Sequence, residues 1–208
     1  ADIQRSEYHI TRLTHTALPG LNAAYQAPNR AQNLRFYFTE DGIRVIPRTG
    51  DAAWELGIQL AGRGLAELEV KDDSVTYRRN ERYYEILQNT ENGLIYDILF
   101  SSLHGVEFTF TGDLIARRDG YNVDFLTTSG VPVLRLDYVA ISECCRSYAL
   151  LDSVPASMPD TTHLRFEANP SGYPISARLV MRLIALPHTA DWSAESNQAD
   201  AQLGFAVA

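Results

Sequence analysis

Side chains that could hold a cation gather at one point of the chain. Asp119, Asn122 and Asp124 place three oxygen-bearing groups within six residues. Carboxylate and amide oxygens are the ligands that Ca²⁺ prefers. The same residues are typical of a turn leading into a strand whose polar face carries Asn122 and Asp124. The sequence therefore leaves a calcium site and a plain turn as alternatives, and it indicates no other cofactor.

The two cysteines, Cys144 and Cys145, are adjacent. This spacing excludes a C-x-x-C zinc ribbon or thioredoxin-like motif. Three states remain open: free thiols, a disulfide between the two neighbours, or disulfides to another chain. No base that would activate either thiol is indicated nearby.

Motifs for nucleophilic and phosphate chemistry are missing from the sequence. The five histidines are scattered, no G-x-S-x-G motif occurs, and Gly62-Arg63-Gly64 lacks the third glycine of a dinucleotide-binding loop. No catalytic residue is predicted, and we expect that the protein is not an enzyme.

Aromatic residues indicate a different kind of site. Trp54, Tyr83 and Tyr84 are candidates for an exposed platform on which a carbohydrate or another ligand could stack. Most aromatic side chains of a β-sandwich fill its core, but one member of an adjacent pair points outward. By the same argument, Tyr37 in the run Phe36-Tyr37-Phe38 is expected on an exposed face.

The elements that would position these residues are strands. Short runs rich in Val, Ile, Leu, Phe, Tyr and Thr alternate with Gly, Asp, Asn and Pro from about residue 33 to residue 182. They predict about a dozen strands, at residues 34–38, 43–46, 55–60, 66–70, 74–78, 83–88, 94–100, 106–110, 121–126, 131–136, 163–167 and 175–181. The fold class is therefore all-β, either an antiparallel β-sandwich or two packed β-subdomains, with little helix. The best helical candidate is a short turn within residues 191–202.

Two hairpins stand out. Residues 34–38 and 43–46 flank a turn at Asp41-Gly42, where glycine would supply a positive φ. Residues 121–126 and 131–136 flank a second turn that ends at Gly130.

The chain divides into three parts by its pattern. Residues 1–152 form a main β-sandwich domain, and residues 153–186 form a smaller β segment that either stands apart or belongs to the same domain. Residues 153–160, with Pro155 and Pro159, are expected to be an extended surface connection. Residues 187–208 form a linker and one further strand.

Charge and hydropathy exclude two classes of partner. The formal net charge is −8, whereas a nucleic-acid backbone is bound by an excess of Lys and Arg. No apolar run reaches the 18 to 20 or so residues that a membrane-spanning helix needs. Neither nucleic-acid binding nor membrane insertion is expected.

The end of the chain carries a more specific pattern. Residues 192–208 follow W-x-x-E-S-x-Q-A-x-A-x-x-G-x-x-V-A. This pattern resembles the start of the first FG-GAP repeat, a unit of integrin-α-like β-propellers, in large bacterial secreted and cell-surface proteins. Residues 25–35, 38–48 and 176–181 resemble the β-rich N-terminal domain that precedes such repeats.

The resemblance implies an extracellular or cell-surface structural or adhesion module without catalytic residues. Its partners would be other copies of itself or other surface proteins. The calcium loop of the repeat would follow residue 208, so the resemblance assigns no calcium ligand here. It also implies a structural role for residues 28–30, in which Asn29 caps a turn and Arg30 pairs with a carboxylate.

Leu203, Phe205 and Val207 alternate as in a strand, but the remainder of the repeat is not in this chain. A lone strand leaves its backbone N–H and C=O groups without partners. It can fold back, fray, or add to a sheet of a neighbouring copy and so build a filament. The functions predicted from the sequence are therefore self-assembly of a surface module or, as the alternative, carbohydrate binding on an aromatic face.

Overall fold

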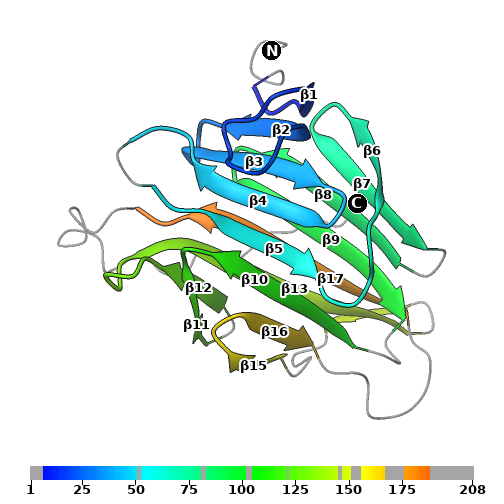
Figure 1. The fold of residues 1–208 in the computed structure, drawn as a ribbon. Helices are drawn as coiled ribbons and strands as arrows, with labels where there is room; N and C mark the ends of the chain where they lie inside the picture. Colours follow the sequence, from blue (N-terminus) through cyan, green and yellow to red (C-terminus); the bar gives the residue numbers. More distant parts are fainter. Residues whose placement is uncertain are drawn as a thin grey trace.

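The computed structural model describes residues 7–50, 53–80, 83–101, 105–120, 122–144, 147–150, 156–166 and 176–187. Within this part the secondary structure consists of strands, which form two antiparallel sheets packed as a sandwich (Figure 1). The prediction of an all-β fold is therefore confirmed. The described residues contain 17 strands, and five of them, at residues 11–13, 24–29, 115–119, 147–150 and 156–160, were not among the dozen expected.

Sheet A contains eight strands in the spatial order β1 (Thr11–Leu13), β2 (Ala24–Asn29), β3 (Leu34–Thr39), β4 (Gly42–Pro47), β5 (Leu56–Leu60), β10 (Val106–Gly112), β16 (His163–Phe166) and β15 (Ala156–Asp160). Sheet B contains nine, in the order β11 (Ile115–Asp119), β12 (Asn122–Leu126), β13 (Pro132–Cys144), β17 (Ser176–Ala185), β9 (Gly93–Ser101), β8 (Tyr83–Thr90), β7 (Ser74–Asn80) and β6 (Glu67–Lys71), with β14 (Ser147–Leu150) paired to β13.

The core lies between the sheets and is built by alternation. Every second side chain of each inner strand points into the sandwich, so that β3 buries Leu34, Phe36 and Phe38. Aromatic rings from opposite sheets meet edge to face. The ring centroids lie 4.9 Å apart for Phe110 and Phe125, 5.7 Å for Tyr96 and Phe108, and 5.0 Å for Tyr138 and Phe166.

Both predicted hairpins form, but Gly42 is needed for a different reason than expected. The β3–β4 turn is Glu40-Asp41, and Gly42 pairs with Thr39 at the start of β4 without a positive φ. A Cβ at Gly42 would lie 2.3 Å from the carbonyl oxygen of Ile58. Close approach of β5 therefore requires glycine here. In the second turn, Gly130 does have a positive φ of 85°.

The C-terminal strands complete both sheets. β15 and β16 extend sheet A beyond β10, and β17 lies between β13 and β9 in sheet B. Residues 156–160, expected to be a connection, form the edge strand β15. Pro159 fits there because the register shifts between Ser157 and Asp160, and because an edge strand tolerates a missing N–H.

Candidate interaction surface

The edges of the two sheets are the first candidates for contact with another protein, because an edge strand presents backbone N–H and C=O groups on one side. The strands at the ends of the sheets are β1 and β15 in sheet A, and β11 and β6 in sheet B. β14 adds a further short edge next to β13. How far each edge is already occupied decides which of them can accept a strand.

At one side of the sandwich, the edges of β15 and β11 cover each other. The N–H of Ala116 in β11 donates to the carbonyl of Thr161 in the β15–β16 turn, at 3.3 Å. The Nη1 of Arg118 donates to the carbonyl of Ala156 in β15, at 2.7 Å. Pro159 removes a further donor from β15. This side is therefore partly closed to an added strand.

At the other side, β6 is more open. β6 and β7 join through the two-residue turn Asp72-Asp73, so Lys71 and Ser74 form the closing hydrogen-bonded pair. Hydrogen-bonded and non-hydrogen-bonded pairs then alternate along the hairpin. Leu68 and Val70 belong to non-hydrogen-bonded pairs, so their backbone N–H and C=O groups point away from β7. Among the described residues, no backbone partner pairs with these outward groups. β6 lies at the margin of sheet B (Figure 1).

Both ends of this open stretch are occupied by residues next to strands of sheet A, Glu40 in the β3–β4 turn and Ile10 just before β1. The N–H of Ala66 donates to the carbonyl of Glu40 at 2.8 Å, and the N–H of Ile10 donates to the carbonyl of Asp72 at 2.7 Å. We call the stretch between these two contacts, with the outward groups of Leu68 and Val70, the β6 slot. β1, by comparison, is three residues long.

The outer face of sheet B carries arginine–carboxylate pairs. Arg135 binds Asp124 with its Nε at 2.7 Å and its Nη2 at 3.1 Å, and its Nη2 also lies 3.0 Å from Asp119. The hydrogen bonds to Asp124 raise the pKa of Arg135. Two similar pairs continue along the face, Arg182 with Asp137 at 2.8 Å and Arg178 with Asp97 at 2.9 Å.

These pairs bear on the calcium candidate. Asp119 and Asp124 are brought together, but the guanidinium of Arg135 binds both carboxylates, while Asn122 starts β12 opposite Asp137. A guanidinium supplies the positive charge that Ca²⁺ would have supplied. No group of three or more His, Cys, Asp or Glu side chains in the described part of the chain is arranged to hold a metal ion.

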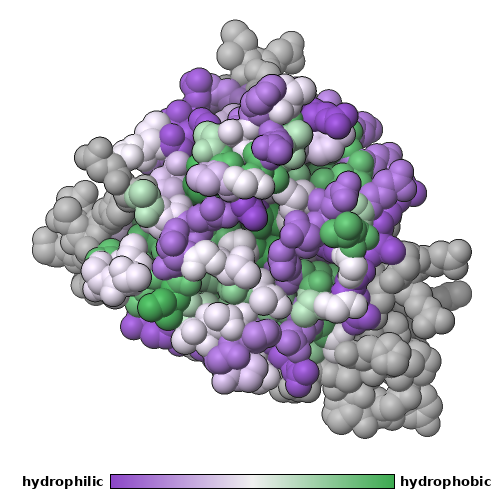
Figure 2. Space-filling view, viewed as in Figure 1, coloured by the Kyte–Doolittle hydropathy of each residue, from purple (hydrophilic) through white to green (hydrophobic). Residues whose placement is uncertain are grey.

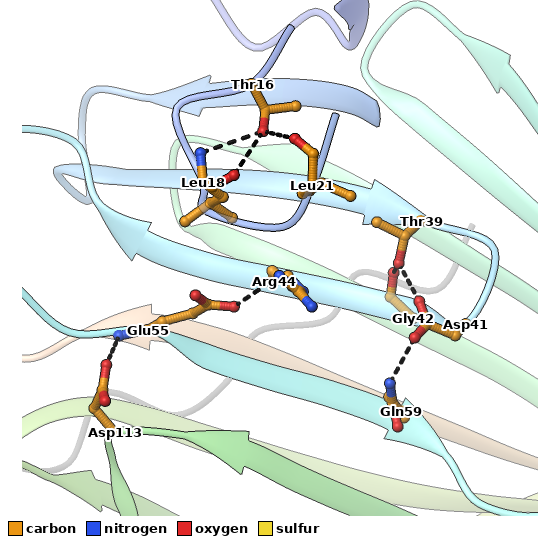
Figure 3. Close-up of polar contacts among 10 residues, drawn as sticks. All are labelled: Thr16, Leu18, Leu21, Thr39, Asp41, Gly42, Arg44, Glu55, Gln59 and Asp113. Atoms are coloured by element: carbon orange, nitrogen blue, oxygen red, sulfur yellow. Dashed lines mark hydrogen bonds and ion pairs between the residues drawn. The ribbon is translucent and has the colours of Figure 1, made fainter. Parts of the chain in front are cut away.

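The outer face of sheet A is used by contacts within the chain. The loop of residues 14–23 lies over β3 and β4, where the Thr16 hydroxyl accepts from the N–H of Leu18 at 3.2 Å (Figure 3). Further along, Arg44 pairs with Glu55 at 3.4 Å. Hydrophilic residues cover much of this face, with smaller apolar areas between them (Figure 2).

The aromatic platform expected from the sequence is not supported by Trp54. Its side chain belongs to the core cluster and is only 9% exposed. The side chains of Tyr83 and Tyr84 lie outside the described part of the structure. Tyr37, expected to be exposed, is fully buried, because the 14–23 loop covers it with Leu18 and Leu21. The predictions for Trp54 and Tyr37 are therefore wrong. Trp54 packs into the main core cluster, and at Tyr37 the outward face of β3 is covered by a loop, which sequence alternation does not reveal.

A buried polar network joins the sheets beside the β6 slot. The Nε of Arg79 donates to Glu85 at 2.6 Å, and these two side chains are 1% and 0% exposed. Tyr96 donates its hydroxyl to the other oxygen of Glu85, and the Tyr77 hydroxyl donates to the carbonyl of Gly42 at 3.0 Å. The Arg79 guanidinium also donates to the carbonyl of Gly64 in the loop before β6.

This network is structural in kind. It is enclosed, and it links β7, β8 and β9 to the β3–β4 turn. Burial, and then the nearby Glu85 charge, raise the pKa of Tyr77 and Tyr96 well above the usual value, so both hydroxyls stay protonated and act as donors.

A second buried polar contact lies at the opposite end of the sandwich. Asn29 of β2 donates its Nδ2 to the Oδ1 of Asn89 of β8 at 2.8 Å, and both residues are fully buried. Asn29 also accepts the N–H of Gln32 at 3.0 Å, which is the turn-capping role expected for it. Arg30 pairs with the carboxylate of Glu7 at 3.0 Å, which is the kind of contact expected for it.

Alternation could have revealed these buried polar groups. Arg79 has the same parity as Val75 and Tyr77 in β7, and both are core residues. Glu85 and Asn89 share the parity of the buried Leu87 in β8. The identity of their partners could not be inferred, because alternation within one strand does not show which residues of other strands lie nearby.

Several predicted site residues lie outside the described residues. They are the strand residues Leu203, Phe205 and Val207, the helical candidate at 191–202, and Cys145. Cys144 ends β13, but its side chain is not described. These predictions stay open.

No protein-family model matches the chain, and no curated protein matches it significantly. In the described residues there is no helix with the length and apolar character needed to cross a membrane.

Proposed function

We propose that this protein is a non-enzymatic, exported surface module that assembles with other copies of itself by β-strand addition. The observation that carries the proposal is the β6 slot, an edge with outward backbone groups at Leu68 and Val70. A strand added to such an edge gains main-chain hydrogen bonds, while the side chains of alternate residues give specificity.

The remaining polar features agree with a structural role. The buried ion pair of Arg79 and Glu85 joins neighbouring strands, and three arginines on the outer face of sheet B, Arg135, Arg178 and Arg182, are paired with carboxylates. The resemblance of residues 192–208 to an FG-GAP repeat supports export and supplies the strand that would be donated.

The size of the native particle tests this proposal. We expect the full chain to form oligomers or filaments in light scattering and negative-stain imaging, and a chain ending at Pro187 to remain monomeric. The shortened chain keeps every strand of both sheets, so it is expected to fold. If both chains are monomeric, assembly through the C-terminal strand is contradicted.

A further inference from the structure

We propose that the β6 slot is the acceptor, and that it binds residues 203–207 of a second copy as an antiparallel strand. The inference rests on the proposed function, since a second copy supplies the strand. It adds the position, the strand direction and the residues of the acceptor, which assembly alone does not specify.

The dimensions of the slot match a short strand. The slot runs from Asp72, occupied by Ile10, to Ala66, occupied by Glu40. Six residue steps at about 3.3 Å each correspond to roughly 20 Å, and five residues of added strand correspond to roughly 17 Å. The N–H and C=O groups of Leu68 and Val70 offer four backbone hydrogen bonds in this interval. A longer strand would collide with the two bounding contacts.

The side chains of β6 match the residue types of the donor. Leu68 and Val70 are half-buried and pack against the core, whereas Glu67, Glu69 and Lys71 are exposed on the other face. In an antiparallel pair, residues directly opposite each other lie on the same face.

The donor alternates in the way that this arrangement requires. If Leu203, Phe205 and Val207 lie on the inner face, two of them stand opposite Leu68 and Val70 and extend the apolar flank of the core. Gly204 and Ala206 then lie beside the charged outer face of β6. Both are small and uncharged, so they leave room for the long charged side chains.

The other edges are less suitable acceptors. In β15, Pro159 has no N–H, and the carbonyl of Ala156 accepts a hydrogen bond from Arg118. In β11, the N–H of Ala116 donates to the carbonyl of Thr161. β1 has three residues and β14 has four. β6 has both the length and the outward groups that strand addition needs.

Hydrogen exchange at the amides of Leu68 and Val70 tests the assignment directly. In the full chain at a concentration at which it assembles, we expect exchange at both amides to be at least about tenfold slower than in the chain ending at Pro187. Dilution to monomers should abolish the difference. Equal exchange in the two chains would overturn the assignment, and slow exchange that persists in dilute monomers would overturn it too, by showing that the chain's own C-terminal segment binds.

A pair of variants separates the two proposals. Val70→Pro removes an outward N–H and should weaken association at least about tenfold, whereas the matched control Val70→Thr keeps the N–H and should associate normally. If Val70→Pro assembles as the original chain does, but shortening at Pro187 abolishes assembly, then the β6 assignment is wrong and the proposed function stands. If shortening changes nothing, the proposed function itself fails. If Val70→Pro does not fold, the exchange experiment on the unsubstituted chain decides.

Discussion

At the scale of single residues, the inward charges of β7 and β8 can be tested quantitatively. Arg79→Met leaves the carboxylate of Glu85 buried beside Tyr96 without its cation. Removing one partner of a buried pair costs about 3–5 kcal/mol of folding free energy, because the remaining charge stays desolvated. Arg79→Met should therefore lower the free energy of unfolding strongly, as measured by urea denaturation.

The double variant Arg79→Met/Glu85→Gln is the control for this prediction. The introduced amide would remain an acceptor for the Tyr96 hydroxyl but carries no charge, so the double variant should be more stable than Arg79→Met alone. Strictly additive losses in the double-mutant cycle would show that the two side chains do not act as a pair.

Asp160 provides a pH prediction at the same scale. Hydrogen bonds from His163 and Thr162 lower the pKa of its carboxyl group from 3.8 to about 2. Because the pKa is lower in the folded state, these contacts stabilise the fold above pH 3.8, and their contribution is lost as the pH falls toward about 2. A carboxyl titration followed by NMR should give a midpoint of about 2, moving upward in His163→Ala. A midpoint near 3.8 in the unsubstituted protein would refute the contact.

At the scale of elements, the distance between neighbouring strands depends on residues without a Cβ. Gly57 of β5 stands opposite Thr111 of β10, and a Cβ at Gly57 would lie 2.2 Å from the Thr111 hydroxyl oxygen. Gly57→Ala should therefore cost about 1–3 kcal/mol of stability through overpacking, measured by denaturation.

A second substitution should relieve this clash. Thr111→Ala removes the hydroxyl, and the next atom of that side chain is 3.6 Å away, an ordinary contact. Gly57→Ala/Thr111→Ala should recover most of the lost stability. Gly42→Ala should not be recoverable in this way, because its clash is with the backbone carbonyl of Ile58. Failure of the double variant to recover would place the constraint elsewhere in β5.

At the scale of the whole molecule, the order of strands in space differs from their order in the chain. β17 forms ten residue pairs with β13 and eight with β9, so it holds sheet B together from the middle. A chain ending at Phe166 lacks this strand and should not fold cooperatively. A chain ending at Pro187 should give a cooperative thermal transition in circular dichroism. Cooperative unfolding of the shorter chain would contradict a single sandwich.

The sequence by itself located twelve of the strands and both hairpins. Alternation of apolar residues is a local property, so β3, β4, β5 and β12 could be located from their own residues, and so could the turns at Asp41 and Gly130. The turn cap of Asn29 and the carboxylate partner of Arg30 were also expected, and both contacts form.

Only the tertiary structure decided what each side chain faces. Trp54 and Tyr37 are buried because distant segments cover them, and Asp119 and Asp124 bind Arg135, which belongs to β13. The same holds for the β6 slot. Pairing of β6 with β7 is local, but the contacts from Ile10 and Glu40 that bound the slot arise only when the two sheets pack. Contacts between residues far apart in the chain depend on the whole fold, and no local pattern encodes them.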